Sequence, residues 1–223
     1  MGMKFGHVVL GMVLVAGATA WWVLRDAGHG TALREGASGT AFACPLPPGV
    51  RSGETPLQTG VPSSLRRFDK DGYALTPLAG FSIEARVLSR EDYRFGREAE
   101  LSPTDLALGW GRMREDAVLA GLSLSQSGRW YRYRWQDAPP MPPDEIVRSS
   151  ANMHMIPADE TVAAALRRVR RDQTVRIDGW LVQADAADGW RWRSSLTRED
   201  SGGGACELVY VCRIGPSAST TAR

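Results

Sequence analysis

The chain has 223 residues, and its 27 Lys and Arg side chains nearly balance its 25 Asp and Glu side chains, which leaves a formal net charge of +2. A charge this close to zero argues against a protein that binds nucleic acid or another polyanion over much of its surface. The length leaves room for a membrane segment, a linker and one globular α+β domain, predicted over residues 67–214. A domain of that size buries enough surface to fold without disulfides or a structural metal.

Residues 1–26 are predicted to form an N-terminal signal anchor with a single transmembrane helix. Residues 5–24 carry no formal charge, and a helix of this length spans about 30 Å, the thickness of the hydrocarbon core of a bilayer. Residues 18–20 resemble a signal-peptidase site, but the apolar run continues through Trp21 and Trp22, which favours an uncleaved anchor. We therefore predict a single-pass protein of the bacterial inner membrane with its C-terminal domain in the periplasm.

Residues 27–66 are rich in Gly, Pro, Ser and Thr, which predicts a flexible linker. The three cysteines are Cys44, Cys206 and Cys212. Cys206 and Cys212 lie in one predicted strand, where six residues span about 20 Å, too far for a disulfide. In an oxidising compartment a disulfide would join Cys44 to one of the other two, and Cys44–Cys206 is the candidate pair. An unpaired Cys44, with Cys206 and Cys212 buried as small apolar residues, agrees equally well with the sequence.

The first half of the predicted domain contains two alternating patterns and one helix start. Residues 81–88 alternate apolar and polar side chains, which predicts a half-buried strand. Ser102 to Asp105 predict the start of a short helix, with Ser as N-cap and Pro at the first helical position. Residues 113–124 fit a helix or a strand. Residues 129–135 predict a second strand. Its two faces are Tyr131, Tyr133 and Trp135 on one side, and Trp130, Arg132 and Arg134 on the other.

A second helix is predicted to follow residues 152–157, which we interpret as a short loop. Asp159 is the expected N-cap of this helix. Val162, Leu166 and Val169 then lie on one helical face and predict its buried side.

The C-terminal third predicts three strands, at residues 175–182, 190–193 and 206–212, joined by short turns as an antiparallel meander. Residues 215–223 are predicted to be a disordered tail. Together these elements predict an α+β fold, mainly an antiparallel sheet or a small open β-barrel with two or three short helices.

Sequence motifs for phosphate-binding loops, dinucleotide-binding loops, nucleophile elbows and zinc-binding helices are absent, and neither a cofactor nor a metal is predicted. His154 is the strongest catalytic candidate because, apart from His29 in the linker, it is the only histidine after the membrane segment. Histidine is the usual general base near neutral pH. Asp105, Asp178 or Asp200 could orient the imidazole, and Ser195 could supply a hydroxyl group, as could Ser194 and Thr197. The alternative is a packed histidine with one backbone hydrogen bond.

A candidate binding surface consists of Trp130, Arg132, Arg134, Trp180 and Trp190, all on predicted strands. Flat rings beside guanidinium groups are typical of the stacking platforms of barrels that bind single-stranded nucleic acid. The alternative is that the rings face the core and the arginines form the solvated face. The balanced charge and the predicted export disfavour nucleic acid, so a glycan, a peptide or a protein partner is the better expectation.

Four segments carry a resemblance to other proteins: RWYRYRW (129–135), SSANMHMIPAD (149–159), SSLTRED (194–200) and GACELVYV (204–211). Their combination resembles an uncharacterised family of small, membrane-anchored bacterial proteins, which implies a bacterial origin and a single anchor but no activity. We therefore predict an accessory component of an envelope complex whose periplasmic domain binds or scaffolds a protein partner. The alternative is a small hydrolase or transferase that uses His154 as general base.

Overall fold

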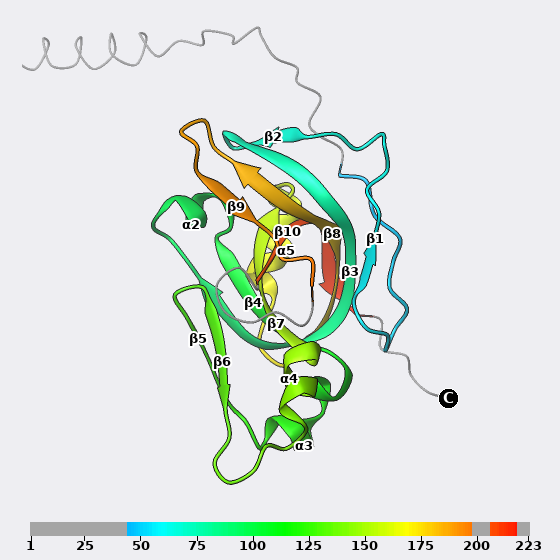
Figure 1. The fold of residues 1–223 in the computed structure, drawn as a ribbon, viewed down its shortest axis with the longest axis vertical. Helices are drawn as coiled ribbons and strands as arrows, with labels where there is room; N and C mark the ends of the chain where they lie inside the picture. Colours follow the sequence, from blue (N-terminus) through cyan, green and yellow to red (C-terminus); the bar gives the residue numbers. More distant parts are fainter. Residues whose placement is uncertain (1–43, 198–205, 218–223) are drawn as a thin grey trace, which may run out of the picture. The chain divides into compact units, whose positions relative to one another are not determined.

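The computed structural model describes residues 44–197 and 206–217 (Figure 1). The predicted anchor at residues 1–26 and the first part of the predicted linker lie outside these residues, as do residues 218–223 of the predicted tail. Within the described part of the chain, no helix combines the length and the apolar character needed to cross a bilayer. The anchor and the periplasmic location therefore stay predictions.

A mixed, partly closed sheet dominates the structure, which confirms the sheet-rich α+β prediction. Its five main strands are β3 (Tyr73–Asp92), β4 (Thr104–Gly109), β7 (Ser150–Pro157), β8 (Thr174–Asp185) and β10 (Glu207–Pro216). Strand β3 pairs with β8 through residues 74–86 and with β4 through residues 86–92, so the sheet returns on itself. Two register shifts in β3, at Pro77/Ala79 and Val87/Ser89, help a strand of 20 residues to curve in this way. The order around the sheet is β3-β4-β7-β10-β8, with β7 and β10 parallel and the other neighbours antiparallel.

Smaller elements surround this sheet. Strands β1 (Leu57–Thr59) and β2 (Phe68–Lys70) pair with β3, and β9 (Arg191–Arg193) pairs with β8. A separate hairpin of β5 (Ser123–Ser127) and β6 (Trp130–Arg134) projects beside β4, as Figure 1 shows. The helices are α2 (Arg97–Leu101), the 3₁₀ helix η1 (Gly111–Arg114), α3 (Asp116–Leu119), α4 (Pro143–Ser149) and α5 (Glu160–Arg168).

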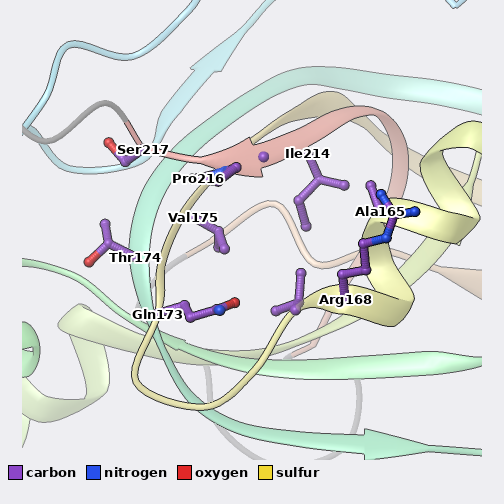
Figure 2. Close-up of a pocket in the computed structure, with 10 residues that line it drawn as sticks. Ala165, Arg168, Gln173, Thr174, Val175, Ile214, Pro216 and Ser217 are labelled. Carbon is purple, nitrogen blue, oxygen red and sulfur yellow. The ribbon is translucent and has the colours of Figure 1, made fainter.

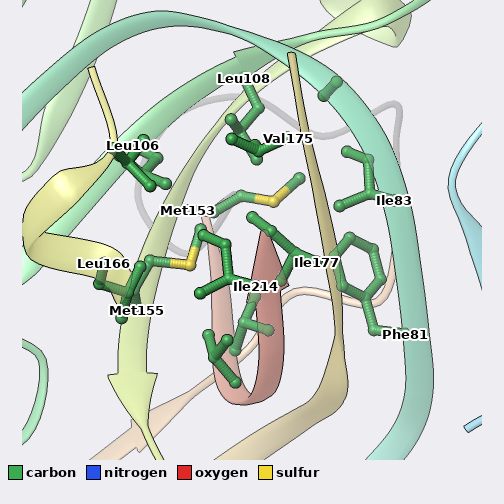
Figure 3. Close-up of a cluster of buried hydrophobic side chains, with 14 of the residues drawn as sticks. Phe81, Ile83, Leu106, Leu108, Met153, Met155, Leu166, Val175, Ile177 and Ile214 are labelled. Carbon is green, nitrogen blue, oxygen red and sulfur yellow. The ribbon is translucent and has the colours of Figure 1, made fainter. Parts of the chain in front are cut away.

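The core lies inside the curved sheet because alternate residues of the five main strands point inward (Figure 3). Helix α5 packs on the same core through Val162 and Leu166, and the Asp159 side chain accepts a hydrogen bond of 2.8 Å from the Val162 backbone N–H. The N-cap and the apolar face predicted for this helix are therefore confirmed. The labelled core residues in Figure 3 are Phe81, Ile83, Leu106, Leu108, Met153, Met155, Leu166, Val175, Ile177 and Ile214.

Three local predictions are wrong. Residues 102–105 do not start a helix, because Leu106 and Leu108 alternate into the core from β4. Residues 152–157 are not a loop but most of β7, whose Met153 and Met155 fill the core in the same way. The C-terminal strands exist but do not form a meander, because β10 pairs with β8 and β7 and not with the three-residue β9. The strand predicted at residues 81–88 is confirmed as part of β3, and the one predicted at residues 129–135 is confirmed over residues 130–134, which form β6.

Residues 44–66 pack against the sheet, so the predicted domain boundary at residue 67 is too late. Val50 and Leu65 are buried, and β1 pairs with the middle of β3. The Val50 backbone N–H donates a hydrogen bond of 2.8 Å to the Ser82 hydroxyl, and Trp180 Nε1 donates one of the same length to the Pro45 carbonyl.

The disulfide joins Cys44 to Cys212, with Cα atoms 5.4 Å apart, and Cys206 is a free cysteine. The candidate pair Cys44–Cys206 is therefore wrong, although the inference that Cys206 and Cys212 do not pair agrees with the structure. Cys212 lies at a register shift of β10 beside the Pro45 carbonyl, whereas Cys206 precedes the other end of that strand. The extended conformation of β10 separates the two thiols and brings only Cys212 to the N-terminal segment.

Candidate functional site

A buried ionic cluster lies on the outer face of β4 and β7. Asp105 and His154 are cross-strand partners, and their chain neighbours Leu106 and Met153 point into the core. Because side chains alternate along a strand, Asp105 and His154 point to the opposite face. His154 Nδ1 lies 2.9 Å from Asp105 Oδ1, off the axis of a linear hydrogen bond, and both side chains are buried. The sheet thus holds a histidine and a carboxylate together on a rigid surface.

Arg129 holds the carboxylate from the turn of the β5–β6 hairpin. Its Nη1 donates hydrogen bonds of 2.7 Å to Asp105 Oδ1 and 2.9 Å to the Ser102 carbonyl. Gly128 and Arg129 have φ angles of 58° and 70°, the left-handed pair that a tight two-residue hairpin turn requires. The Arg129 guanidinium carbon lies 3.8 Å from the centre of the Tyr93 ring, and Asn152 Nδ2 donates to Asp105 Oδ2 at 3.2 Å. The turn therefore places a cation where the buried carboxylate needs one.

Trp192 covers the imidazole, and Cys206 lies against Arg129 in the same cluster. The ring centres of His154 and Trp192 are 4.7 Å apart, and Cys206 Sγ lies 3.9 Å from the Arg129 carbonyl oxygen. Burial by itself lowers the pKa of His154, but the adjacent Asp105 carboxylate and the neighbouring Cys206 side chain outweigh it and raise that pKa to about 9. His154 is therefore an imidazolium cation at neutral pH.

This protonation should make stability depend on pH. A pKa raised from 6.5 to about 9 by folding means that the stabilisation is complete below about pH 6.5 and is lost as pH rises through 9. We expect the free energy of unfolding to fall by up to about 3 kcal/mol across that window. The measurement is urea denaturation of the protein, with its disulfide intact, between pH 6 and pH 10. His154→Gln should flatten the curve relative to the wild type, and two parallel curves would contradict the assignment.

The structure brings Asp105, one of the predicted orienting acids, to His154, whereas Asp178 has other partners. Asp178 Oδ1 accepts a hydrogen bond of 2.6 Å from Ser82, and its Oδ2 accepts one of 2.8 Å from Arg213. The Ser195 backbone N–H donates to the Cys206 carbonyl, and its hydroxyl donates to the Thr197 carbonyl. Asp105, not Asp178, is the acid beside His154. In residues 44–197 and 206–217, no three His, Cys, Asp or Glu side chains are grouped so that they could hold a metal ion.

The predicted aromatic and arginine surface is divided between separate places. Trp130 is 41% exposed and Arg132 and Arg134 are exposed on β6, while Tyr131 and Tyr133 pack on a second apolar cluster. Trp180 is only 2% exposed, beneath the segment that contains Pro45. A buried Trp180 cannot stack on a ligand, so its assignment as a binding residue is wrong.

A hollow of about 500 Å³ lies next to the ionic cluster. The β3–β4 connection contributes Phe95, which is 92% exposed, and Arg97, whose guanidinium carbon lies 5.6 Å from the centre of the Trp190 ring. Asp188 forms an ion pair with Arg97. The hollow is lined by Tyr93, Phe95, Gly96, Arg97, Glu98, Gly128, Arg129 and Trp190.

Of these residues only Trp190 was a candidate from the sequence. The others come from connections whose approach depends on the curvature of the sheet, and no local pattern indicates it. For Asp105 a signal existed, because the alternation of residues 104–109 is that of a strand.

A second hollow, of about 610 Å³, lies between α5, the start of β8 and the end of β10 (Figure 2). Val169, Val175 and Ile214 make much of its wall, and Arg168 is the charged residue at its edge. None of the residues in the ionic cluster lines it. Its wall is mainly apolar, and the hydroxyl groups of Thr174 and Ser217 are among its polar lining groups.

No family model, no curated protein and no solved structure matches the chain.

Proposed function

We propose that residues 44–217 form the exported binding domain of a single-pass envelope protein, and that its ligand occupies the hollow beside the ionic cluster. The observation that carries this proposal is the lining of that hollow, where Tyr93, Phe95 and Trp190 stand next to Arg97 and Glu98. A concave surface with aromatic rings and a few charged groups is the usual form of a binding site. The buried cluster beneath Arg129 gives that surface a fixed support.

The arrangement of the strands supports the same location. In chain order the five main strands are β3, β4, β7, β8 and β10, and their order around the sheet is β3-β4-β7-β10-β8. The third and fifth strands along the chain, β7 and β10, are parallel, and α5 lies between the third and the fourth. This arrangement is similar to that of OB-fold barrels. In such barrels the first-to-second and fourth-to-fifth connections bind oligonucleotides and oligosaccharides. Here the corresponding connections supply Tyr93 to Glu98 and Trp190.

The charges around the hollow favour a neutral ligand. Arg97 is paired with Asp188, and Arg129 is paired with Asp105 and lies 3.6 Å from Glu98. Cations that already have acidic partners have little capacity left for a chain of phosphates. Exposed aromatic faces suit the flat, apolar faces of sugar rings. We therefore infer a glycan of the envelope as the ligand, with the protein acting as an accessory component of an envelope complex.

The alternative, a hydrolase or transferase with His154 as general base, is less well supported. An imidazolium has no free lone pair with which to accept a proton, and the raised pKa keeps His154 charged at neutral pH. Binding in the hollow does not depend on a proton transfer.

The test is co-sedimentation of the full chain, in detergent micelles, with purified peptidoglycan. Trp190→Ala should weaken binding about tenfold or more, because the loss of one aromatic contact at the centre of a site costs more than about 1 kcal/mol. Trp135→Ala is the matched control, since Trp135 is an exposed tryptophan that does not line the hollow. Equal losses in the two variants would contradict the proposal. Binding that falls steeply with salt would point to a polyanion instead.

A further inference from the structure

The second hollow, between α5, the start of β8 and the end of β10, combines apolar walls with an arginine at its edge (Figure 2). We propose that it binds a fatty acid, with the alkyl chain against the apolar walls and the carboxylate at Arg168. This hollow shares no lining residue with the one beside the ionic cluster. The inference therefore goes beyond the proposed glycan site and does not depend on it.

The end of β7 explains why the fold leaves a space here. Strand β7 pairs with residues 207–211 of β10 and ends at Pro157, after which the chain turns into α5. The remaining residues of β10 keep β8 as a neighbour on one side and have no other strand beside them among the described residues. The second hollow lies between this part of β10 and the helix.

The walls of the second hollow belong to the main hydrophobic core. Val169, Val175 and Ile214 line it, are buried and are members of the core cluster, and Ala165 of α5 packs against the same cluster. Figure 2 shows Val175 and Ile214 on the strands and Ala165 on the helix around one open space. Its volume of about 610 Å³ is typical of a small-molecule site. An alkyl chain bound here would extend the core and leave water, which is favourable.

Other arginines already hold the carbonyl groups at the end of α5. Arg170 Nη1 donates hydrogen bonds of 2.7 Å and 3.0 Å to the carbonyls of Arg167 and Val169. Arg90 Nη1 donates to the Leu166 carbonyl and, at 3.1 Å, to the Val169 carbonyl. These two cations occupy the end of the helix where its dipole favours positive charge. The helix therefore does not need a further arginine at this end.

Arg168 has no such structural role. Within residues 44–197 and 206–217, no acid and no carbonyl group pairs with its guanidinium, which lies at the edge of the second hollow. Glu84 accepts a hydrogen bond from the Ser217 hydroxyl at another part of the lining, but it is buried and already paired with Arg114 at 3.3 Å. The charge available to a ligand is therefore positive. A guanidinium binds a carboxylate through two parallel hydrogen bonds.

The other polar groups of the lining are few and mostly occupied. Gln173 Oε1 accepts a hydrogen bond of 2.9 Å from the Arg170 backbone N–H, and the Ser217 hydroxyl is engaged as described above. A sugar, which carries hydroxyl groups around its ring, would find few partners here. A fatty acid has one anionic group and an apolar chain, and these are the two properties that the second hollow matches.

A series of fatty acids tests the apolar part of the site. The full chain in micelles of a steroid-based detergent, which has no alkyl chain to compete, is titrated calorimetrically at pH 7 with hexanoate, octanoate and decanoate. Protein-free micelles give the blank. Burial of each methylene group tightens binding about fourfold, so each step of two carbons should lower the Kd by about tenfold or more. Equal Kd values for the three acids would overturn the proposal, and no binding of any of them would overturn it in favour of a protein partner.

Octanol and an arginine variant test the anionic end. Octanol has the chain of octanoate without the charge and should bind about tenfold more weakly. Arg168→Gln should weaken octanoate binding by about the same factor and leave the affinity for octanol unchanged. Arg167→Gln is the matched control, because Arg167 lies on the same helix, is paired with Glu160 and does not line the second hollow. Equal losses in the two variants, or equal affinities for octanoate and octanol, would overturn the assignment of Arg168.

Discussion

Replacing Asp105 with alanine should lower the free energy of unfolding by about 3–5 kcal/mol, because it leaves two buried cations without their counter-charge. Asp105 is fully buried, accepts a hydrogen bond of 2.7 Å from Arg129 and lies 2.9 Å from His154. Asn152 also loses an acceptor in this variant. The measurement is urea denaturation of the full chain in detergent micelles, followed by tryptophan fluorescence.

Asp116→Ala is the matched control for this loss. Asp116 also forms an ion pair with an arginine, Arg86, but its side chain is 89% exposed. Exposed pairs contribute about 0–1 kcal/mol, so this variant should unfold close to the wild type. If Asp105→Ala loses no more stability than Asp116→Ala, the cluster is not the support that we infer for the hollow.

Opening the Cys44–Cys212 disulfide should lower the free energy of unfolding by about 4 kcal/mol. The bond joins residues separated by 168 positions, so it removes much of the conformational freedom of the unfolded chain. Urea denaturation with and without a reducing agent measures the effect, and Cys44→Ser should reproduce it. Cys206→Ser, which keeps the cross-link, should retain a large difference between the two conditions. Equal midpoints with and without the reductant would contradict the expectation.

The same disulfide tests the proposed export. Disulfides persist in oxidising compartments and are rare in the cytosol. Cells that are quenched with acid and alkylated should therefore carry label on Cys206 only. Label on all three cysteines would place the domain in a reducing compartment and contradict a periplasmic location.

Two kinds of element were predictable from the sequence: strands with a long alternation of apolar and polar residues, and a helix end fixed by a hydrogen bond between residues close in sequence. The alternation of residues 81–88 and 129–135 predicts strands because one face of each must be buried, and both are observed. Asp159 predicts the start of α5 because the N-cap hydrogen bond joins residues only three positions apart in the sequence. Residues 102–105 show the limit of such rules. Their helix-start signal is local, but the burial of Leu106 and Leu108 in a curved sheet outweighs it.

For the site, the sequence alone identified His154 and Trp190 as candidates and included Asp105 among the acids that could orient the imidazole. It also excluded a disulfide between Cys206 and Cys212. It could not choose between these acids, nor identify Arg129 and Cys206 as neighbours of His154. Only the tertiary structure decided these, because β4, β7, β10 and the β5–β6 turn meet through strand pairing and turn geometry. The sequence determines the chemical type of each side chain, whereas strand register determines which side chains meet. A shift of one residue in β4 would turn Asp105 toward the core and Leu106 toward His154.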